Sequence, residues 1–90
     1  MLTLEEIKKK MQGLQDWALE GQAIVKDLHF QGGFKEAMVF VNKVAEIAEK
    51  HNHHPTILIE YNYVRLTLTT HSSNSLTHLD FLVAEDIDKI

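Results

Sequence analysis

A long stripe of apolar residues in the middle of the chain constrains the fold most. Apolar side chains recur there every three or four residues, which is the spacing of one face of an α-helix. The stripe comprises Phe34, Ala37, Met38, Val41, Val44, Ala45 and Ala48. Gly32-Gly33 breaks the chain before it, and Pro55 cannot continue a helix after it. The spacing predicts an amphipathic helix that runs to about Lys50 and packs its apolar face against another element.

Two segments rich in strand-forming residues flank this helix. The segment from Trp17 to Phe30 is interrupted at Gly21, which predicts two strands joined by a tight turn. The segment 56–70 is rich in Ile, Leu, Val, Tyr and Thr, and Asn62 in its middle predicts a second turn. Apolar and polar residues alternate from Val64 to Thr69, so one face of that strand is expected to be buried.

Short helical patterns lie at both ends of the chain. Thr3 and Glu6 have the spacing of a capping box, and Thr77 is a predicted N-cap with Asp80 in the first turn. The predicted order is therefore α-β-β-α-β-β-α. This order indicates an α+β fold with a four-stranded, mostly antiparallel sheet and three helices on one face. Ninety residues are enough for one modest core, so we expect residues 1–90 to form a single domain.

Charge and composition narrow the classes of function. Thirteen acidic residues against nine basic ones give a formal net charge of −4, which argues against direct nucleic-acid binding and against attachment to anionic membranes. No apolar run approaches the roughly 18–20 residues of a membrane span, and the N-terminus lacks the layout of a signal peptide. We therefore expect a cytoplasmic protein. The sequence contains no cysteine, so a nucleophile or metal ligand must come from His, Asp, Glu, Ser or Thr.

Histidine is the residue type that carries chemical information, with six in the chain. His53 and His54 lie in the turn that follows the long helix. If the next two strands pair across Asn62, positions near 54 and near 70 lie opposite each other, which brings these histidines toward His71. Imidazoles gain and lose protons near neutral pH, so this group can supply a general acid and a general base.

Two carboxylates lie close to these histidines in the predicted fold. Glu49 is one helical turn before His53, and Asp80 is at the start of the last helix. Either one can orient an imidazole or hold a substrate N–H, because an ionised carboxylate accepts hydrogen bonds. Each also has a simpler explanation, Glu49 as a solvated helix face and Asp80 as an acidic residue favoured by the helix dipole.

Other interpretations of the histidines stay open from the residues alone. A histidine-rich turn can be an ordinary solvated loop. Three imidazoles with Glu49 or Asp80 are also ligand types for zinc or nickel, but their spacing matches no known motif and HExxH is absent, so we predict no metal. The serines after His71 lack the glycine-flanked turn that presents the nucleophile of a serine hydrolase.

A wider pattern of residues resembles that of the pterin-4a-carbinolamine dehydratases. The matching residues are Ala48-Glu49-Lys50, His53-His54-Pro55, Tyr61, Val64, Leu66-Thr67-Leu68, Thr70-His71, Leu76-Thr77 and Asp80. The resemblance extends over nearly the whole chain. It implies dehydration of a 4a-hydroxytetrahydropterin to a quinonoid dihydropterin, in support of tetrahydrobiopterin recycling, with no metal or organic cofactor.

The resemblance also implies roles for individual residues. His53, His54 and His71 would form the catalytic set, with His53 and His71 as acid and base and His54 positioning the substrate. Glu49, Thr70 and Asp80 would be the polar groups that bind and support the substrate. The partner would be a small pterin, and family members commonly form dimers by joining sheet edges, and sometimes tetramers. A homodimer or homotetramer is therefore expected here.

Two positions depart from the family pattern. Thr56-Ile57 stands where an acidic residue and often an aromatic one are expected, and Asn74-Ser75 replaces a glycine pair. Asn tolerates a left-handed backbone conformation, so the loop can still form. These departures leave open a second hypothesis, a dimerising scaffold that keeps the fold without the catalysis.

Overall fold

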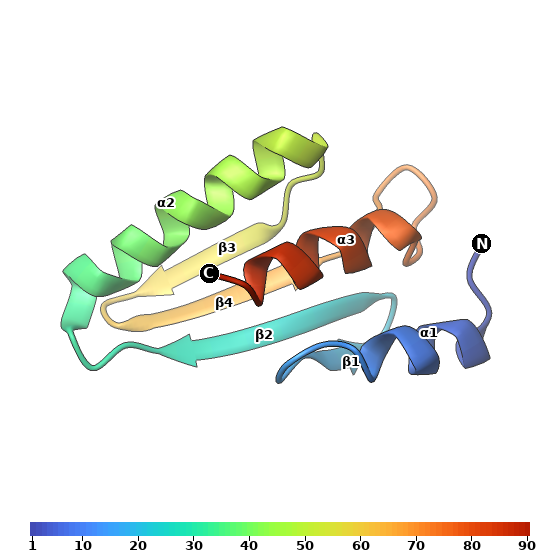
Figure 1. Cartoon of the computed structure of the whole chain (residues 1–90), viewed down its shortest axis with the longest axis horizontal. Coiled ribbons are helices and arrows are strands. Elements are labelled where there is room, and N and C mark those ends of the chain that lie inside the picture. The colour runs from blue at the N-terminus through green and yellow to red at the C-terminus, as the bar shows by residue number, and fades with distance from the viewer.

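The computed structural model describes all ninety residues and confirms the predicted order of elements (Figure 1). The strands form one antiparallel sheet in the order β1-β2-β4-β3, so β4 lies in the interior and β3 lies at an edge. No helix is both long enough and apolar enough to cross a membrane. The elements are α1 (Leu4–Met11), β1 (Ala18–Glu20), β2 (Ala23–His29), α2 (Gly33–His51), β3 (Thr56–Glu60), β4 (Tyr63–Leu68) and α3 (His78–Ile87).

The core lies between the helices and one face of the sheet (Figure 1). The predicted alternation in β4 is confirmed, because every second residue from Val64 to Leu68 is fully buried. Helices α2 and α3 contribute most of the remaining buried residues, and Ile7 and Met11 of α1 pack against the same cluster. The buried cluster comprises Trp17, Ile24, Ala37, Val41, Val44, Val64, Leu66, Leu68, Leu76, Phe81, Val83, Ala84 and Ile87.

A buried ion pair fastens the C-terminal end of α3 to the sheet. Lys26 Nζ of β2 lies 2.8 Å from Asp88 Oδ1, and the two side chains are only 11% and 8% exposed. Asp88 also accepts hydrogen bonds from the Trp17 indole (2.9 Å) and from the Gln15 backbone N–H (2.8 Å). Burying charge is unfavourable unless the charge is paired and hydrogen-bonded, and here the carboxylate has three partners. The end of α3 is thereby held against both β2 and the loop before β1.

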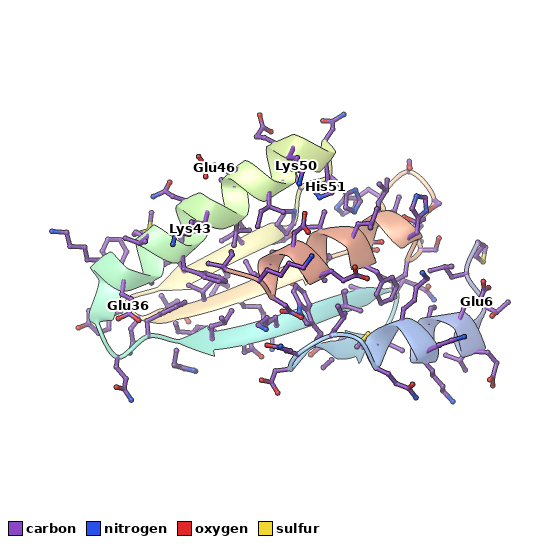
Figure 2. The ribbon with its side chains drawn as sticks, viewed as in Figure 1. Glu6, Glu36, Lys43, Glu46, Lys50 and His51 are labelled. Atoms are coloured by element: carbon purple, nitrogen blue, oxygen red, sulfur yellow. The ribbon has the colours of Figure 1, made fainter.

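A second carboxylate, that of Asp86, joins α3 to the last turn of α2. His51 Nε2 lies 2.7 Å from Asp86 Oδ2, and Lys50 and Lys89 approach the same carboxylate at 3.8 and 3.9 Å. Figure 2 shows Lys50 and His51 at this end of α2. The hydrogen bond from His51 is the main reason why the pKa of Asp86 lies below its ordinary value, and the charge of Lys50 lowers it further. His51 therefore has a structural role between two helices.

This pairing makes the stability of the fold depend on pH. The pKa of Asp86 is lower in the folded chain, so its stabilising effect is complete above the ordinary value of 3.8 and is lost as the pH falls through the folded value. We expect Asp86→Asn to lower the free energy of unfolding by up to about 1 kcal/mol at pH 6, and by less at pH 3. Urea denaturation at both pH values measures the difference. Glu85→Gln, at an exposed neighbour without an ion pair, is the control, and equal losses for Asp86→Asn at both pH values would contradict the assignment.

Candidate active site

Three segments that are distant in sequence meet at one end of the molecule. These are the turn between α2 and β3, the loop between β4 and α3, and the first turn of α3 (Figure 1). In the β3–β4 hairpin Thr56 pairs with Thr67 and Glu60 with Tyr63. Continuing this register beyond the strands places position 53 opposite position 70. The predicted hairpin is thus confirmed, with its turn at Tyr61 and Asn62.

The direction in which the chain leaves α2 is set by Asn52. Its backbone is left-handed, with φ 49° and ψ 44°. The N–H groups of Asn52 and His53 donate back to the carbonyls of Glu49 (3.2 Å) and Ala48 (3.0 Å). Asn adopts this conformation more readily than other residues with a side chain. Pro55 was expected to stop the helix, but α2 already ends before Asn52, and Pro55 follows in the extended segment that leads into β3.

The carboxylate of Asp80 is the centre of the candidate site, and it is completely buried. Its Oδ1 lies 2.5 Å from His53 Nε2. Its Oδ2 accepts hydrogen bonds from the Thr70 hydroxyl (2.8 Å) and from the Thr77 backbone N–H (2.9 Å). One carboxylate therefore connects the α2–β3 turn, the chain beyond β4 and the N-terminus of α3.

The imidazole of His53 is held on one side and open on the other. Its side chain is 11% exposed, and Nε2 faces Asp80. Nδ1 makes no hydrogen bond within the chain, and no buried side-chain nitrogen or oxygen lacks a partner, so Nδ1 reaches the surface. An imidazole that is oriented by a buried carboxylate and has one accessible nitrogen can transfer a proton to or from a ligand.

Three other predicted residues lie outside this network. His54 Nε2 pairs instead with the carboxylate of Glu49, and the two side chains are 55% and 77% exposed. The strand-forming segment was expected to run to residue 70, just before His71, but β4 ends at Leu68 and His71 lies in an exposed turn. No three His, Asp or Glu side chains are close enough together to hold a metal ion. The structure brings together His53, Thr70 and Asp80, and the convergence of all three imidazoles on one substrate stays a prediction.

The two departures from the family pattern have clear structural places. Asn74 has a positive φ of 50°, so it adopts the left-handed conformation that was expected to let the loop form. Two backbone hydrogen bonds between Thr70 and Ser75, of 3.0 and 3.3 Å, close this loop. Ile57 is half-buried and packs against the core cluster. Both departures are accommodated without disturbing the hydrogen bonds of Asp80.

The side chain of Thr77 is a member of the site that was not predicted from the sequence. Thr77 was predicted only as an N-cap with Asp80 in the first turn; the structure confirms the N-cap and shows that Asp80 completes a capping box. The Thr77 hydroxyl also lies 2.8 Å from that of Thr70, so it extends the network around the carboxylate. The sequence signal that would have identified the Thr77 hydroxyl is its capping-box spacing to Asp80, combined with the histidine-rich turn at His53 and His54.

A hollow of about 360 Å³ lies beside this network. Its lining is rich in hydroxyl groups, and His78 and the first two residues of the chain complete it. A larger hollow of about 700 Å³ follows the outer face of α2, but its lining contains no histidine and only Glu49 among the predicted site residues. The smaller hollow adjoins the Asp80 network through Thr70 and Thr77, but none of His53, His54 and His71 lines it; its lining residues are Met1, Leu2, Thr70, Ser72, Ser73, Thr77, His78 and Leu79.

Comparison with known proteins shows a match over the whole chain. Residues 1–90 match the family model described as pterin 4 alpha carbinolamine dehydratase. A relative from Sulfurisphaera tokodaii named "Putative pterin-4-alpha-carbinolamine dehydratase" is 43% identical over 89 residues, covering 99% of this chain and 95% of the relative. A relative of the same name from Nostoc sp. is 44% identical over 90 residues, covering 100% and 96%.

Solved structures show the same similarity. The crystal structure of a transcriptional coactivator/pterin dehydratase from Brucella melitensis matches with a TM-score of 0.91 at 36% identity, covering 98% of this chain and 95% of that one. A pterin dehydratase-like protein described as a RuBisCO assembly factor in the alpha-carboxysome matches with a TM-score of 0.69 at 21% identity, covering 86% and 90%. A similarity as distant as the second shows a shared fold alone.

The buried position of Asp80 leads to a stability prediction. Asp80→Asn keeps the shape but replaces one acceptor oxygen with a donor, so at least one of the surrounding donors loses its partner. We expect the free energy of unfolding to fall by about 1–3 kcal/mol. Glu6→Gln is the matched control, because Glu6 has the same place in the capping box of α1 but is exposed, and the loss there should be clearly smaller than for Asp80→Asn. Urea denaturation measures both, and equal losses would contradict a special role for Asp80.

Proposed function

Because this chain belongs to the pterin 4 alpha carbinolamine dehydratase family, we propose that it catalyses the dehydration of a 4a-hydroxytetrahydropterin to a quinonoid dihydropterin. The observation that carries the proposal is the pairing of buried Asp80 with His53, whose second ring nitrogen is open to solvent. Loss of water needs one group that gives a proton and one that takes a proton. Histidine is suited to both tasks near neutral pH, so the reaction needs no metal or organic cofactor.

The proposed reaction is balanced without an oxidant or a reductant. The bond between C4a and its hydroxyl oxygen breaks, and the oxygen leaves as water after it has received a proton. A ring nitrogen loses its proton, and the electron pair of that N–H bond becomes the new double bond of the quinonoid product. Each proton transfer by a positioned side chain typically contributes roughly 10²–10⁴-fold in rate. We propose His53 and His71 for these two transfers.

The remaining predicted residues support these imidazoles in different ways. We propose that His54, which pairs with Glu49 beside the larger hollow, positions the substrate. Thr70 and Asp80 act through His53, since their side-chain oxygens already take part in the hydrogen-bond network. The hollow beside them, at about 360 Å³, falls within the range of roughly 300–1,000 Å³ that is usual for small-molecule sites.

We place this reaction in tetrahydrobiopterin recycling, with a small pterin as the substrate. This assignment follows from the family, because the product is an oxidised dihydropterin that a later reduction must return to the tetrahydro form. The cytoplasmic location stays a prediction from the sequence.

A non-catalytic scaffold is the second candidate function. The observation that favours it is the fold shared with a protein described as a RuBisCO assembly factor, a role that belongs to that protein. The departures from the family pattern at Ile57 and Asn74-Ser75 motivate the scaffold hypothesis. The loop at Asn74 is closed and Ile57 packs against the core, so neither departure removes a hydrogen bond of Asp80. This supports the enzyme over the scaffold.

A dehydration assay tests the proposed function directly. Freshly generated 4a-hydroxytetrahydropterin loses water spontaneously, so the measured quantity is the rate above this background. We expect His53→Ala and His71→Ala each to lower kcat by roughly 10²–10⁴-fold. His29→Ala is the control, because His29 lies at the C-terminal end of β2, where its ring centroid is 4.9 Å from that of Tyr63. The kcat of this variant should match that of the wild type. A wild-type rate equal to the background would refute the enzyme and favour the scaffold.

We also propose that the chain forms a homodimer, or a homotetramer built from such dimers, by joining sheet edges. The supporting observation is that β3 pairs on one side only, which leaves an open edge, and that Leu58 on this strand is exposed. An unpaired edge presents free N–H and C=O groups to a second strand.

Sedimentation equilibrium tests the assembly. We expect the mass of two or four chains, and we expect Leu58→Lys at the β3 edge to shift the protein toward the monomer. Leu19→Lys is the matched control, because Leu19 is similarly exposed but lies on β1 at the opposite edge. A wild-type protein with the mass of one chain would exclude the assembly, and dissociation by Leu19→Lys alone would move the interface to β1.

A further inference from the structure

The hydrogen positions around Asp80 follow from the chemistry of its neighbours. A carboxylate only accepts, so the Thr70 hydroxyl donates to Asp80 Oδ2 at 2.8 Å. Thr70 has a single hydroxyl proton, and it is used in this bond. In the 2.8 Å contact between the two hydroxyls, Thr77 must therefore donate to Thr70. All hydroxyl protons of the network thus point toward the carboxylate.

The backbone of α3 supplies the other end of this chain of hydrogen bonds. The Leu79 N–H donates to the Thr77 hydroxyl oxygen at 3.3 Å, which leaves the hydroxyl proton of Thr77 free to point at Thr70. The backbone N–H of Thr77 also donates to Asp80 Oδ2, at 2.9 Å. The orientation of both hydroxyls is therefore fixed by backbone groups in the first turn of one helix.

The same donors decide where the proton between Asp80 and His53 lies. Asp80 Oδ2 receives two hydrogen bonds, and donors of this kind stabilise the ionised form of a buried carboxylate. The only group in the network that could accept a proton from Asp80 is His53 Nε2, at 2.5 Å from Oδ1. With the negative charge held on Asp80, the shared proton resides on the imidazole, and Nε2 is the donor.

We infer that this network fixes neutral His53 as the tautomer with its proton on Nε2, so that His53 reacts through Nδ1, and that Thr70 and Thr77 are positioning residues for it. The inference rests on the proposed function for its catalytic meaning. Neutral His53 would accept a proton at Nδ1, and protonated His53 would donate one from the same atom. In both states Nε2–H donates to Asp80, whose charge stabilises the imidazolium.

Nuclear magnetic resonance of the histidine ring nitrogens tests the tautomer without any substrate. Ring nitrogens with and without a proton resonate far apart in ¹⁵N, and His53→Asn assigns the signals of His53. In the wild-type protein, when the His53 imidazole is neutral, we expect its single ring proton on Nε2. We expect Thr70→Val, which removes the hydroxyl donor to Asp80 in a side chain of similar shape, to raise the share of the other tautomer several-fold. Thr70→Ser keeps the hydroxyl and should keep the wild-type spectrum.

Kinetics and a second capping box supply the controls. Thr70→Val and Thr77→Val should lower kcat by about 10- to 100-fold, as is typical when a group that orients a functional side chain is removed, with little change in KM. Thr77→Ser should restore kcat. Thr3→Val removes the equivalent N-cap hydroxyl of α1, where no histidine is attached, and should change neither the His53 tautomer nor kcat.

Two results would overturn the inference. One is a wild-type His53 with its proton on Nδ1, and the other is a Thr70→Val protein that keeps both the wild-type tautomer and the wild-type kcat. If wild-type His53 carries its proton on Nε2, responds to Thr70→Val as expected, and yet the protein shows no dehydration, the network stands and the dehydratase proposal fails.

Discussion

A carboxylate without any contact to water is the constraint on which the functional end of this molecule depends. Asp80 is fully buried, and a buried charge is tolerated only when its oxygens have hydrogen-bond partners. Those partners come from the turn after α2, from the chain beyond β4 and from the first residues of α3. The conformation of each of these three segments therefore depends on the other two. As a result, the imidazole of His53 reaches its position when the chain folds.

Helix α3 is held by acidic residues along its length. Asp80 anchors its start, Asp86 pairs with the end of α2, and Asp88 accepts three hydrogen bonds beside β2. The apolar side of the helix supplies the packing energy, but apolar contacts have no direction. The carboxylates add direction, because each one is satisfied only in a particular rotation and depth of the helix. This explains how a helix of ten residues can present the donors of its first turn with a defined geometry.

Sequence patterns were sufficient to predict those parts of the structure that depend on local spacing, such as the position of a helix, a strand or an N-cap. The helix α2, the alternation in β4 and the N-caps at Thr3 and Thr77 each follow from a local periodicity or spacing, and the structure confirms them, but Phe34 and Ala45 of the predicted apolar stripe are exposed. The register of the hairpin placed position 53 opposite position 70 because a two-residue turn leaves little choice. Register locates backbone atoms, however, and not the direction of a side chain. Rotamers and loop geometry, which no spacing in the sequence specifies, decide the remaining contacts. These are the pairing of His54 with Glu49, the placement of His71 in a turn and the contact of the Thr77 hydroxyl with Thr70.

Every residue of the Asp80 network lies between positions 53 and 80. The first 48 residues contribute α1, β1, β2 and most of α2 but no member of this network; they support it by packing and by the hydrogen bonds of Gln15, Trp17 and Lys26 to Asp88 of α3. Packing tolerates exchange among apolar side chains of similar volume far better than a hydrogen-bond network tolerates loss of a member. Most positions of the earlier half are thus constrained mainly by shape, with Trp17 and Lys26 as polar exceptions, whereas the later half is constrained by the identity of a few polar atoms.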